Sequence, residues 1–278
     1  MTLPLVAALI AVGSFLAGML GALTGLGGGI IVVPMLTLLF HVDLRYAIGA
    51  SLVSVIATSS GAAAAYVREG YTNVRIGIFL EVGTTIGALA GAALATVIPT
   101  SALAVMFAIV LLYTAFRSFQ QREEHVTTDP PHPWAVTLRL NGSYPVKGEM
   151  VPYTVQGVTS GFAIMGLAGM LSALLGIGSG VVKVLAMDRR MRLPFKVSTT
   201  TSNFMIGVTA AASAGVYLHR GYIVPTIAVP VMLGVLAGAL TGARILTSAS
   251  TAKLRLLFTV VVSILAVEML YKGVTGGL

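Results

Sequence analysis

The residues best suited to bind a ligand lie in two glycine-rich stretches inside apolar sequence. TGLGGGIIVVP covers residues 24–34, and LLGIGSGVVKVL covers residues 174–185. Glycine costs about 1 kcal/mol relative to alanine inside a helix, so each stretch is expected to break the helix that enters it. A helix that restarts after such a break presents unpaired backbone N–H groups, whose dipoles favour an anion. The two breaks together therefore predict a site for one small anion.

Close packing is the alternative role of glycine in membrane helices. We assign GALAGA at 87–92 and GALTGA at 238–243 to packing, and the denser glycines of the two breaks to ligand lining. The residues predicted to line the site at the breaks are Gly25, Gly27, Gly28, Gly29, Gly176, Gly178, Ser179 and Gly180.

Two charged residues inside apolar sequence are candidates for function, because charges are rare there and usually functional. Lys183 follows the second glycine break by three residues, and its ammonium is expected to neutralise the bound anion. Snorkelling of Lys183 to the membrane surface is the alternative. Glu81 is the candidate for carrying a coupling proton, with an interfacial position as its alternative.

Hydroxyl and amide side chains form a third cluster, STTTSN at 198–203. Such a run is costly in a membrane helix unless it faces protein or a polar cavity, and it can donate hydrogen bonds to an oxyanion. Hydrogen bonding between or within helices is the alternative. Ser51, Ser54 and Thr58 share one helical face through their i, i+3, i+7 spacing. The cluster and this face add the predicted lining residues Ser51, Thr58, Thr200, Thr201, Ser202 and Asn203.

The elements that must position these residues are membrane helices. The 278-residue chain is 56% hydrophobic and only 9% charged, with a mean hydropathy of +0.95, whereas soluble domains carry about 25% charged residues. Backbone groups in lipid must be satisfied internally, so the fold is predicted to be all-α and polytopic. The apolar segments lie at roughly 3–23, 28–41, 46–67, 76–98, 101–116, 153–175, 178–187, 197–218, 222–246 and 254–271.

A polar segment divides the chain in the middle. QQREEHVTTDPPHPW is rich in proline and charge, and typical of a linker. Apolar and polar residues then alternate over 136–140 before an Asn141-Gly142 turn signal, which predicts a small, water-facing β-hairpin. The predicted division is an N-terminal membrane repeat at 1–117, a soluble linker with this hairpin at 118–152, and a C-terminal membrane repeat at 153–278.

The two membrane halves repeat each other. GLGGG at 25–29 returns as GIGSG at 176–180, and AGML at 17–20 returns at 168–171, both at an offset of 151 positions without a gap. The match continues through Tyr and Thr residues, so it is more than shared composition. The sequence therefore predicts an internal repeat.

Charge predicts that the repeats are inverted. Lys and Arg collect on the cytoplasmic side of membrane proteins, which places DRRMRLPFK at 188–196 inside the cell. The same rule leaves its counterpart HVDLRY, at 41–46, outside, with both termini extracytoplasmic. Each half is then a Gly-broken helical hairpin plus three transmembrane helices. Interrupted helices in inverted repeats are typical of secondary transporters, whose sites lie at the membrane midplane.

Several function classes are disfavoured by what the sequence lacks. The chain contains no cysteine, which excludes disulfides, thiolate metal sites and a Cys nucleophile, and we predict no metal and no cofactor. It has no P-loop pattern for ATP. Its net charge of +8 is scattered over short loops, so no nucleic-acid partner is expected. The GxSG motif of a serine hydrolase would need glycine two residues before Ser179, where this chain has Ile177. We therefore predict no catalytic residues and no enzyme activity.

The chain resembles the sulfite exporter TauE/SafE family of membrane anion permeases. The resemblance is carried by GLGGGIIVVP at 25–34, GIGSGVVKV at 176–184 and KVSTTTSNFMIGVTAAASA at 196–214, and it extends over both membrane halves. It implies transport of small sulfur-containing oxyanions such as sulfite, organosulfonates or thiosulfate. Ser179 and Leu185 stand at the repeat counterparts of Gly28 and Pro34, so the second motif departs from the first.

We therefore expect a secondary transporter that works by alternating access around a midplane site between the repeats. An anion channel and a non-transporting membrane subunit are the alternatives. The expected partners are a small anionic substrate and the lipid bilayer of the bacterial cytoplasmic (inner) membrane. A homo-oligomer is compatible with the sequence.

Overall fold

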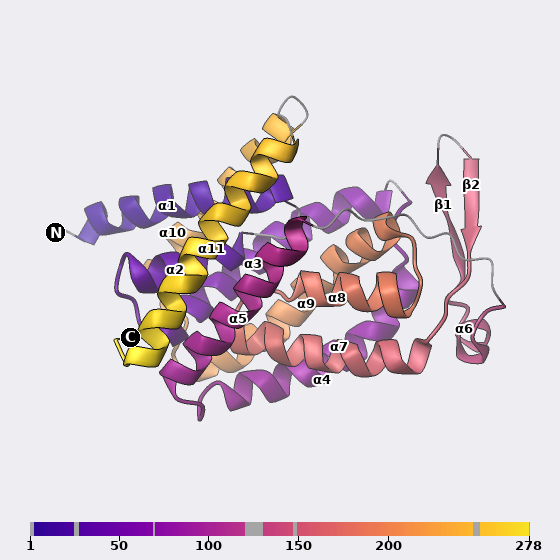
Figure 1. Cartoon of the computed structure of the whole chain (residues 1–278), viewed down its shortest axis with the longest axis horizontal. Coiled ribbons are helices and arrows are strands. Elements are labelled where there is room, and N and C mark those ends of the chain that lie inside the picture. Colours follow the sequence, from indigo (N-terminus) through magenta and orange to yellow (C-terminus); the bar gives the residue numbers. More distant parts are fainter. Residues whose placement is uncertain are drawn as a thin grey trace.

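The fold is a bundle of helices with a small two-stranded sheet at one end (Figure 1). The computed structural model describes residues 3–24, 28–68, 70–119, 130–146, 149–246 and 251–277. The elements of the first half are α1 (Leu3–Thr24), α2 (Gly29–Leu38), α3 (Leu44–Arg68), α4 (Val74–Leu94) and α5 (Thr100–Phe119). The middle segment holds α6 (Pro133–Thr137), β1 (Gly142–Val146) and β2 (Glu149–Tyr153). The second half holds α7 (Val158–Leu175), α8 (Gly180–Leu185), the π-helix η1 (Ala186–Arg190), α9 (Phe195–His219), α10 (Pro225–Leu246) and α11 (Thr251–Thr275).

Among the described residues, five helices are long and apolar enough to cross a membrane. These spans are Pro4–Gly21, Val74–Leu94, Val158–Leu175, Pro225–Gly242 and Leu256–Thr275. On α4, Ile78, Val82 and Ile86 are exposed on the outside of the bundle, whereas Leu80 and Thr84 are fully buried. An apolar exposed face opposite a buried face that carries polar groups is what a lipid environment requires. The all-α polytopic prediction is confirmed, and the chain is a multi-pass membrane protein.

The helix boundaries follow the sequence repeat. The starts of α2, α3 and α5 each lie 151 residues before the starts of α8, α9 and α11. Backbone conformation recurs in the same register, because His41 and its counterpart Arg192 have φ angles of 52° and 54°. Gly70 and Gly221, another counterpart pair, both have φ of 76°. The two halves therefore share their local structure as well as their sequence.

The halves interlock rather than sit side by side. The first-half helix α1 packs on α10 of the second half, and the counterpart pair α7 and α4 packs in the same way. Helices α3 and α9 pack on each other at the centre, as do α5 and α11 at the periphery. In Figure 1, α5 runs from lower left to upper right, and its counterpart α11 returns from upper right to the C-terminus at lower left.

Glycines set the distance between the interlocked helices. A Cβ atom added to Gly87 on α4 would collide with the carbonyl oxygen of Gly166 on α7. The counterpart contact is the same, since a Cβ at Gly238 on α10 would collide with the carbonyl of Phe15 on α1. GALAGA and GALTGA therefore serve close helix packing, as predicted.

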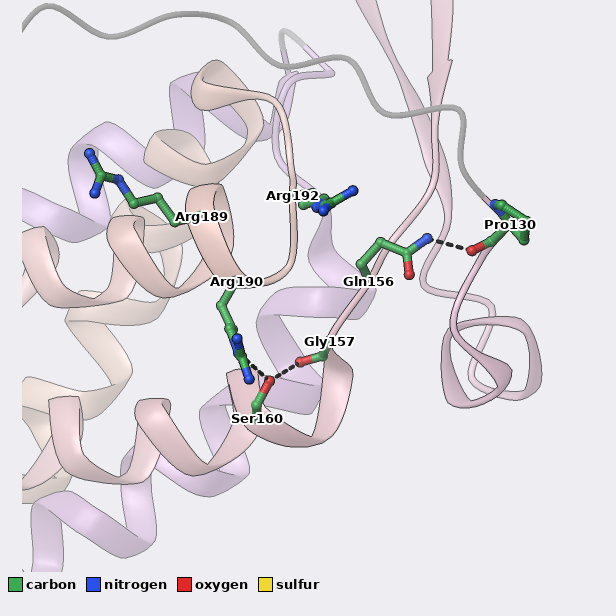
Figure 2. A pocket seen from close by; sticks show the side chains of 7 residues that line it. All are labelled: Pro130, Gln156, Gly157, Ser160, Arg189, Arg190 and Arg192. Atoms are coloured by element: carbon green, nitrogen blue, oxygen red, sulfur yellow. Dashed lines mark hydrogen bonds between the residues drawn. The ribbon is translucent and has the colours of Figure 1, made fainter.

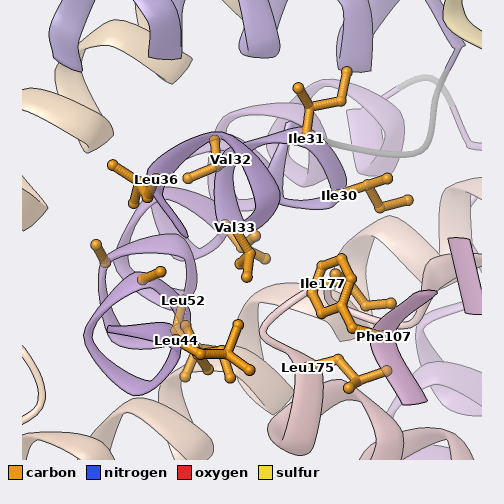
Figure 3. Packing of buried hydrophobic residues seen from close by; sticks show 14 of the residues in the cluster. Ile30, Ile31, Val32, Val33, Leu36, Leu44, Leu52, Phe107, Leu175 and Ile177 are labelled. Carbon is orange, nitrogen blue, oxygen red and sulfur yellow. The ribbon is translucent and has the colours of Figure 1, made fainter. Parts of the chain in front are cut away.

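Helix α2 lies in the interior of the protein, where all ten of its residues are buried (Figure 3). Its apolar side chains, including Val33 and Leu36, pack toward Leu44 and Leu52 of α3 and toward Leu175 and the following Ile177. A helix that is apolar on every side needs such an enclosed position. Ten residues rise about 15 Å, roughly half of a bilayer core. Helices α1 and α2 therefore form the interrupted element that the first glycine run predicted.

The hairpin exists, but it starts later in the chain than the alternating pattern indicated. Residues 133–137 form the helical turn α6, because Pro133 opens it and the His132 side chain accepts a hydrogen bond from the Trp134 amide at 3.2 Å. The Asn141 side chain accepts from the Val155 amide at 3.0 Å instead of forming the hairpin turn. Strand β1 begins at Gly142 and pairs antiparallel with β2. Gly142 therefore starts the first strand of the hairpin instead of lying in its turn, as the sequence had predicted.

Candidate functional site

The second glycine break is a four-residue link, 176–179, in which three residues have left-handed backbone. Helix α7 ends at Leu175, and Gly176, Gly178 and Ser179 have φ angles of 66°, 69° and 46° before α8 begins. Glycine adopts this region without penalty, whereas serine is strained there. The sequence GIGSG therefore ends one helix and redirects the chain into the next.

The first break is described only at its end. Gly28 caps α2 and Gly29 opens it, and both are buried. The predicted lining residues Gly25 and Gly27 lie outside the described residues. Both described glycines are tightly enclosed, since a Cβ at Gly28 would lie 2.7 Å from Cγ1 of Val235. This part of the break belongs to the packed centre of the protein.

Ser51 of α3 joins the two breaks. Its hydroxyl donates to the carbonyl of Gly176 at 2.7 Å and lies 3.4 Å from the carbonyl of Gly29. A Cβ added to Gly29 would stand 3.1 Å from the same Gly176 carbonyl oxygen. The structure thus brings Gly29, Ser51 and Gly176 together, although they come from three different helical elements.

Lys183 and Glu81 meet through a threonine. The Lys183 side chain is fully buried, and its ammonium donates to the Thr209 hydroxyl of α9 at 2.6 Å. Thr209 in turn donates to Oε1 of Glu81 on α4 at 2.7 Å. This is not the geometry of a lysine that snorkels to the surface. The chain of bonds connects the half-helix after the second break to a helix of the first half.

Glu81 is only partly satisfied by this arrangement. It is 7% exposed, and Thr85 adds a second hydroxyl to Oε1 at 3.3 Å. The other oxygen, Oε2, is buried and has no hydrogen-bond partner among the described residues. A buried ion pair is stabilising only when its remaining lone pairs and protons are satisfied. The site therefore holds a carboxylate with one unused acceptor next to an ammonium.

Ser179 has an unused donor at the break itself. Its side chain is 4% exposed, and Oγ has no hydrogen-bond partner among the described residues. It lines a cavity of about 10 Å³, which is room for about one water molecule. The other residues around this cavity are Ile30, Val110, Thr114, Leu171, Ile177, Gly180, Val181 and Val182. Ser179 lies one helical turn before Lys183, because the Lys183 amide donates to the Ser179 carbonyl at 3.1 Å.

The side chains of the hydroxyl cluster on α9 have different hydrogen-bond partners. Ser202 approaches the second break, with Oγ 3.4 Å from the Gly180 carbonyl. Thr201 accepts a hydrogen bond from the Asn73 amide at 3.0 Å and so fixes the start of α4. Thr200 donates to the Lys196 carbonyl of its own helix at 2.9 Å. The Asn203 side chain is partly buried.

Thr58 and Thr209 are repeat counterparts with different partners. Thr58 donates to the Ser54 carbonyl one turn earlier in its own helix, at 3.0 Å, whereas Thr209 stands between two charges. Thr209 was not among the predicted lining residues. The signal that could have found it is its place seven residues after Ser202 on one face of α9.

Comparisons with known proteins place this architecture in a family. The family model for the sulfite exporter TauE/SafE matches residues 10–269, and the chain belongs to this family. A match over nearly the whole chain covers both repeats and the hairpin between them. No solved structure matches the chain.

Curated relatives are named as transporters. The chain is 27% identical to the probable membrane transporter protein YunE of Bacillus subtilis over 93% of this chain and 95% of the relative. It is 29% identical to the probable membrane transporter protein YdhB of the same organism, over 83% and 86% of the two chains. The probable membrane transporter protein MJ0441 of Methanocaldococcus jannaschii is 25% identical over 92% of each chain. Family and relatives both indicate a membrane transporter rather than an enzyme.

Proposed function

We propose that the protein is a secondary transporter for a small sulfur-containing oxyanion such as sulfite, an organosulfonate or thiosulfate. The observation that carries the proposal is the fully buried ammonium of Lys183, one turn after the Ser179 hydroxyl, which has no hydrogen-bond partner in the described part of the chain. Together with the N–H groups at the start of α8, these groups offer an anion one positive charge and several donors. The family name supplies the sulfur chemistry.

In this proposal the substrate replaces Thr209 and Glu81 as the partner of Lys183. The anion reaches the breaks when the packed centre opens, and it binds the ammonium together with the Ser179 hydroxyl. The cavity at Ser179 is too small for an oxyanion in the present conformation, so binding at this place requires the packed centre to open. The Lys183 ammonium would leave Thr209 of α9, and α8 would move away from the cavity walls on α2, α5 and α7. Alternating access would use a motion of this kind.

Charge balance gives Glu81 a role in coupling. When an anion binds Lys183, Glu81 loses its positive partner and becomes a buried, uncompensated carboxylate. Such a group is strongly destabilising, so it takes up a proton. One proton would therefore accompany one anion, and its release would restore the bonds from Glu81 through Thr209 to Lys183.

We also propose that the repeats are inverted in a bacterial cytoplasmic membrane, with both termini outside. The opposed directions of α5 and α11 in Figure 1 support this arrangement. The chain has no cysteine of its own, so single introduced cysteines report unambiguously. His41→Cys and Arg192→Cys mark counterpart turns and should react with an impermeant maleimide from opposite sides of the membrane. Labelling of both from one side would contradict the inversion.

Transport itself is tested in proteoliposomes with an imposed pH gradient, comparing sulfite, thiosulfate and methanesulfonate. The proposal predicts saturable uptake of at least one of these anions, faster when the side that supplies the anion is acidic. In Glu81→Gln the dependence on the pH gradient should disappear. Conductance without saturation would instead indicate an anion channel, and no flux of any anion through correctly folded protein would refute the proposal.

A further inference from the structure

A second cluster of positive charge surrounds a pocket of about 540 Å³ at the surface (Figure 2). The pocket lies where α7 begins and η1 ends, away from Lys183. Its lining residues are Pro130, Gln156, Gly157, Ser160, Arg189, Arg190 and Arg192. Three of these seven are arginine and none is acidic. Ligand pockets in proteins span about 300–1,000 Å³, so the volume suits a small molecule or a headgroup.

The backbone explains why the arginines gather. Helix η1 closes with a π-type bond from the Met191 amide to the Ala186 carbonyl at 3.0 Å. Met191 is fully buried, so the chain on either side of it turns Arg190 and Arg192 outward. The Gln156 amide donates to the Met191 carbonyl at 3.1 Å, which ties this turn to the residues before α7.

Gly157 allows the two walls of the pocket to approach each other. It caps α7 with φ of 50°, and a Cβ there would lie 2.5 Å from the Arg190 carbonyl oxygen. The Arg190 side chain then reaches Ser160, with Nε donating to its hydroxyl at 2.9 Å (Figure 2). This bond uses only Nε, and the described residues give the two terminal nitrogens of the guanidinium no acceptor, so both can make a bidentate contact with an oxyanion.

The start of α7 adds a second source of attraction. Helix α7 has eighteen residues, and the first N–H groups of a helix have no intrahelical acceptor. Their dipoles favour an anion in the pocket that the three arginines line. The general excess of cations on one side of a membrane protein requires no pocket, whereas these residues share one.

We propose that this pocket binds a phosphate-like oxyanion group, carried either by a free anion or by the headgroup of an anionic lipid. The site is separate from the central one, because none of its residues contacts Lys183, Thr209 or Glu81 through a hydrogen bond. It rests on the Arg190 guanidinium, which is held beside Ser160 at the start of α7, with Arg189 and Arg192 adding positive charge around the pocket.

The test uses the full chain in nanodiscs and has two arms. In neutral phosphatidylcholine, binding of radiolabelled inorganic phosphate is measured by equilibrium dialysis. In nanodiscs that contain phosphatidylglycerol, retained lipid is counted by native mass spectrometry. Wild type is compared with the double variant Arg189→Gln, Arg190→Gln and with Arg220→Gln, which removes an exposed arginine at the end of α9, outside the pocket.

The double variant should weaken phosphate binding, lipid retention or both by about tenfold or more, which corresponds to about 1.4 kcal/mol. Arg220→Gln should change neither. Loss in the phosphate arm identifies a free anion as the ligand, and loss in the lipid arm identifies a headgroup. Equal binding by all three proteins in both arms would overturn the proposal. The double variant Lys183→Met, Glu81→Gln, which removes both central charges together, should leave pocket binding intact, so failure here and failure of the transport proposal remain distinguishable.

Discussion

Ser51 and Ser202 stand 151 residues apart in the chain and occupy equivalent places at the two glycine breaks. The Ser51 hydroxyl lies 3.4 Å from the carbonyl of Gly29, and the Ser202 hydroxyl lies 3.4 Å from the carbonyl of Gly180, which is the counterpart of Gly29. Ser51 alone also donates to Gly176 across the centre, at 2.7 Å. The two breaks therefore share the same serine-to-carbonyl contact, and only Ser51 also makes the hydrogen bond that links them.

This pair offers a matched test of the link. Ser51→Ala removes a short buried hydrogen bond and leaves the Gly176 carbonyl without it, which should destabilise the protein by about 1 kcal/mol. Ser202→Ala removes only a long contact and should cost clearly less. Thermal unfolding in one detergent ranks the two variants. Equal loss in both would show that the Gly176 bond contributes nothing to holding the breaks together.

Lys183→Met should abolish uptake and also destabilise the protein. Thr209 bridges Lys183 and Glu81, so loss of Lys183 leaves the buried Glu81 carboxylate uncompensated. For a direct buried ion pair, such a loss costs about 3–5 kcal/mol. Adding Glu81→Gln removes the stranded charge, so the double variant should regain most of the lost stability. Uptake should stay absent in the double variant, because the substrate has lost its cation. The comparison needs thermal unfolding and proteoliposome flux on the same preparations.

This double variant separates two roles of Lys183. A lysine that only holds the fold together would allow transport to return together with stability. Recovery of saturable uptake in Lys183→Met, Glu81→Gln would therefore contradict the substrate role while leaving the structural one.

Gly178→Ala should stop transport even though it adds a single methyl group. Its φ of 69° is a left-handed conformation, which costs a residue with a Cβ about 1–2 kcal/mol. The new Cβ would also lie 2.9 Å from Cγ2 of Ile206. Gly215→Ala is the control, because nothing lies within 4 Å of its Cβ position and its counterpart, Ala64, already carries the methyl group. We expect Gly215→Ala to retain flux. Similar flux in both variants would show that transport does not require glycine at the left-handed position 178.

The sequence predicted what depends on composition and periodicity. Segments 28–41 and 178–187 became the short α2 and α8–η1, because each follows a run in which nearly every second residue or more is glycine, and such a run disfavours helix. The offset between the halves was readable because both repeats kept the same spacing, which the helix starts reproduce. These features are local or repetitive, so neighbouring residues are enough to reveal them.

The contacts across the bundle were not readable in this way. Lys183 and Glu81 could be named as buried charges, but only the packing of α4 against α9 places Thr209 between them. The hairpin was shifted because alternation over 136–140 competed with a proline that opens a helical turn. Nothing near Asn73 in the chain indicated that its side chain binds the Leu140 carbonyl and the Tyr153 hydroxyl. Such pairings depend on residues more than sixty positions apart.

The contact between Asn73 and Tyr153 makes docking of the hairpin sensitive to alkaline pH. Burial raises the pKa of the Tyr153 phenol, and the hydrogen bond from Asn73 Nδ2, at 2.7 Å, lowers it by less. The docked state therefore keeps its proton where the released state has lost it, so the docking free energy is fully present below pH of about 10 and falls as the pH rises further. Trp134 is the only tryptophan in the chain and lies in α6 beside the hairpin, so quenching of its fluorescence by acrylamide reports release.

Wild type should become more quenchable above this pH. Tyr153→Phe should be somewhat more quenchable at neutral pH and show a flatter rise, whereas Tyr271→Phe, on the exposed face of α11, should behave as wild type. An identical alkaline rise in Tyr153→Phe and wild type would rule out this phenol as the titrating group.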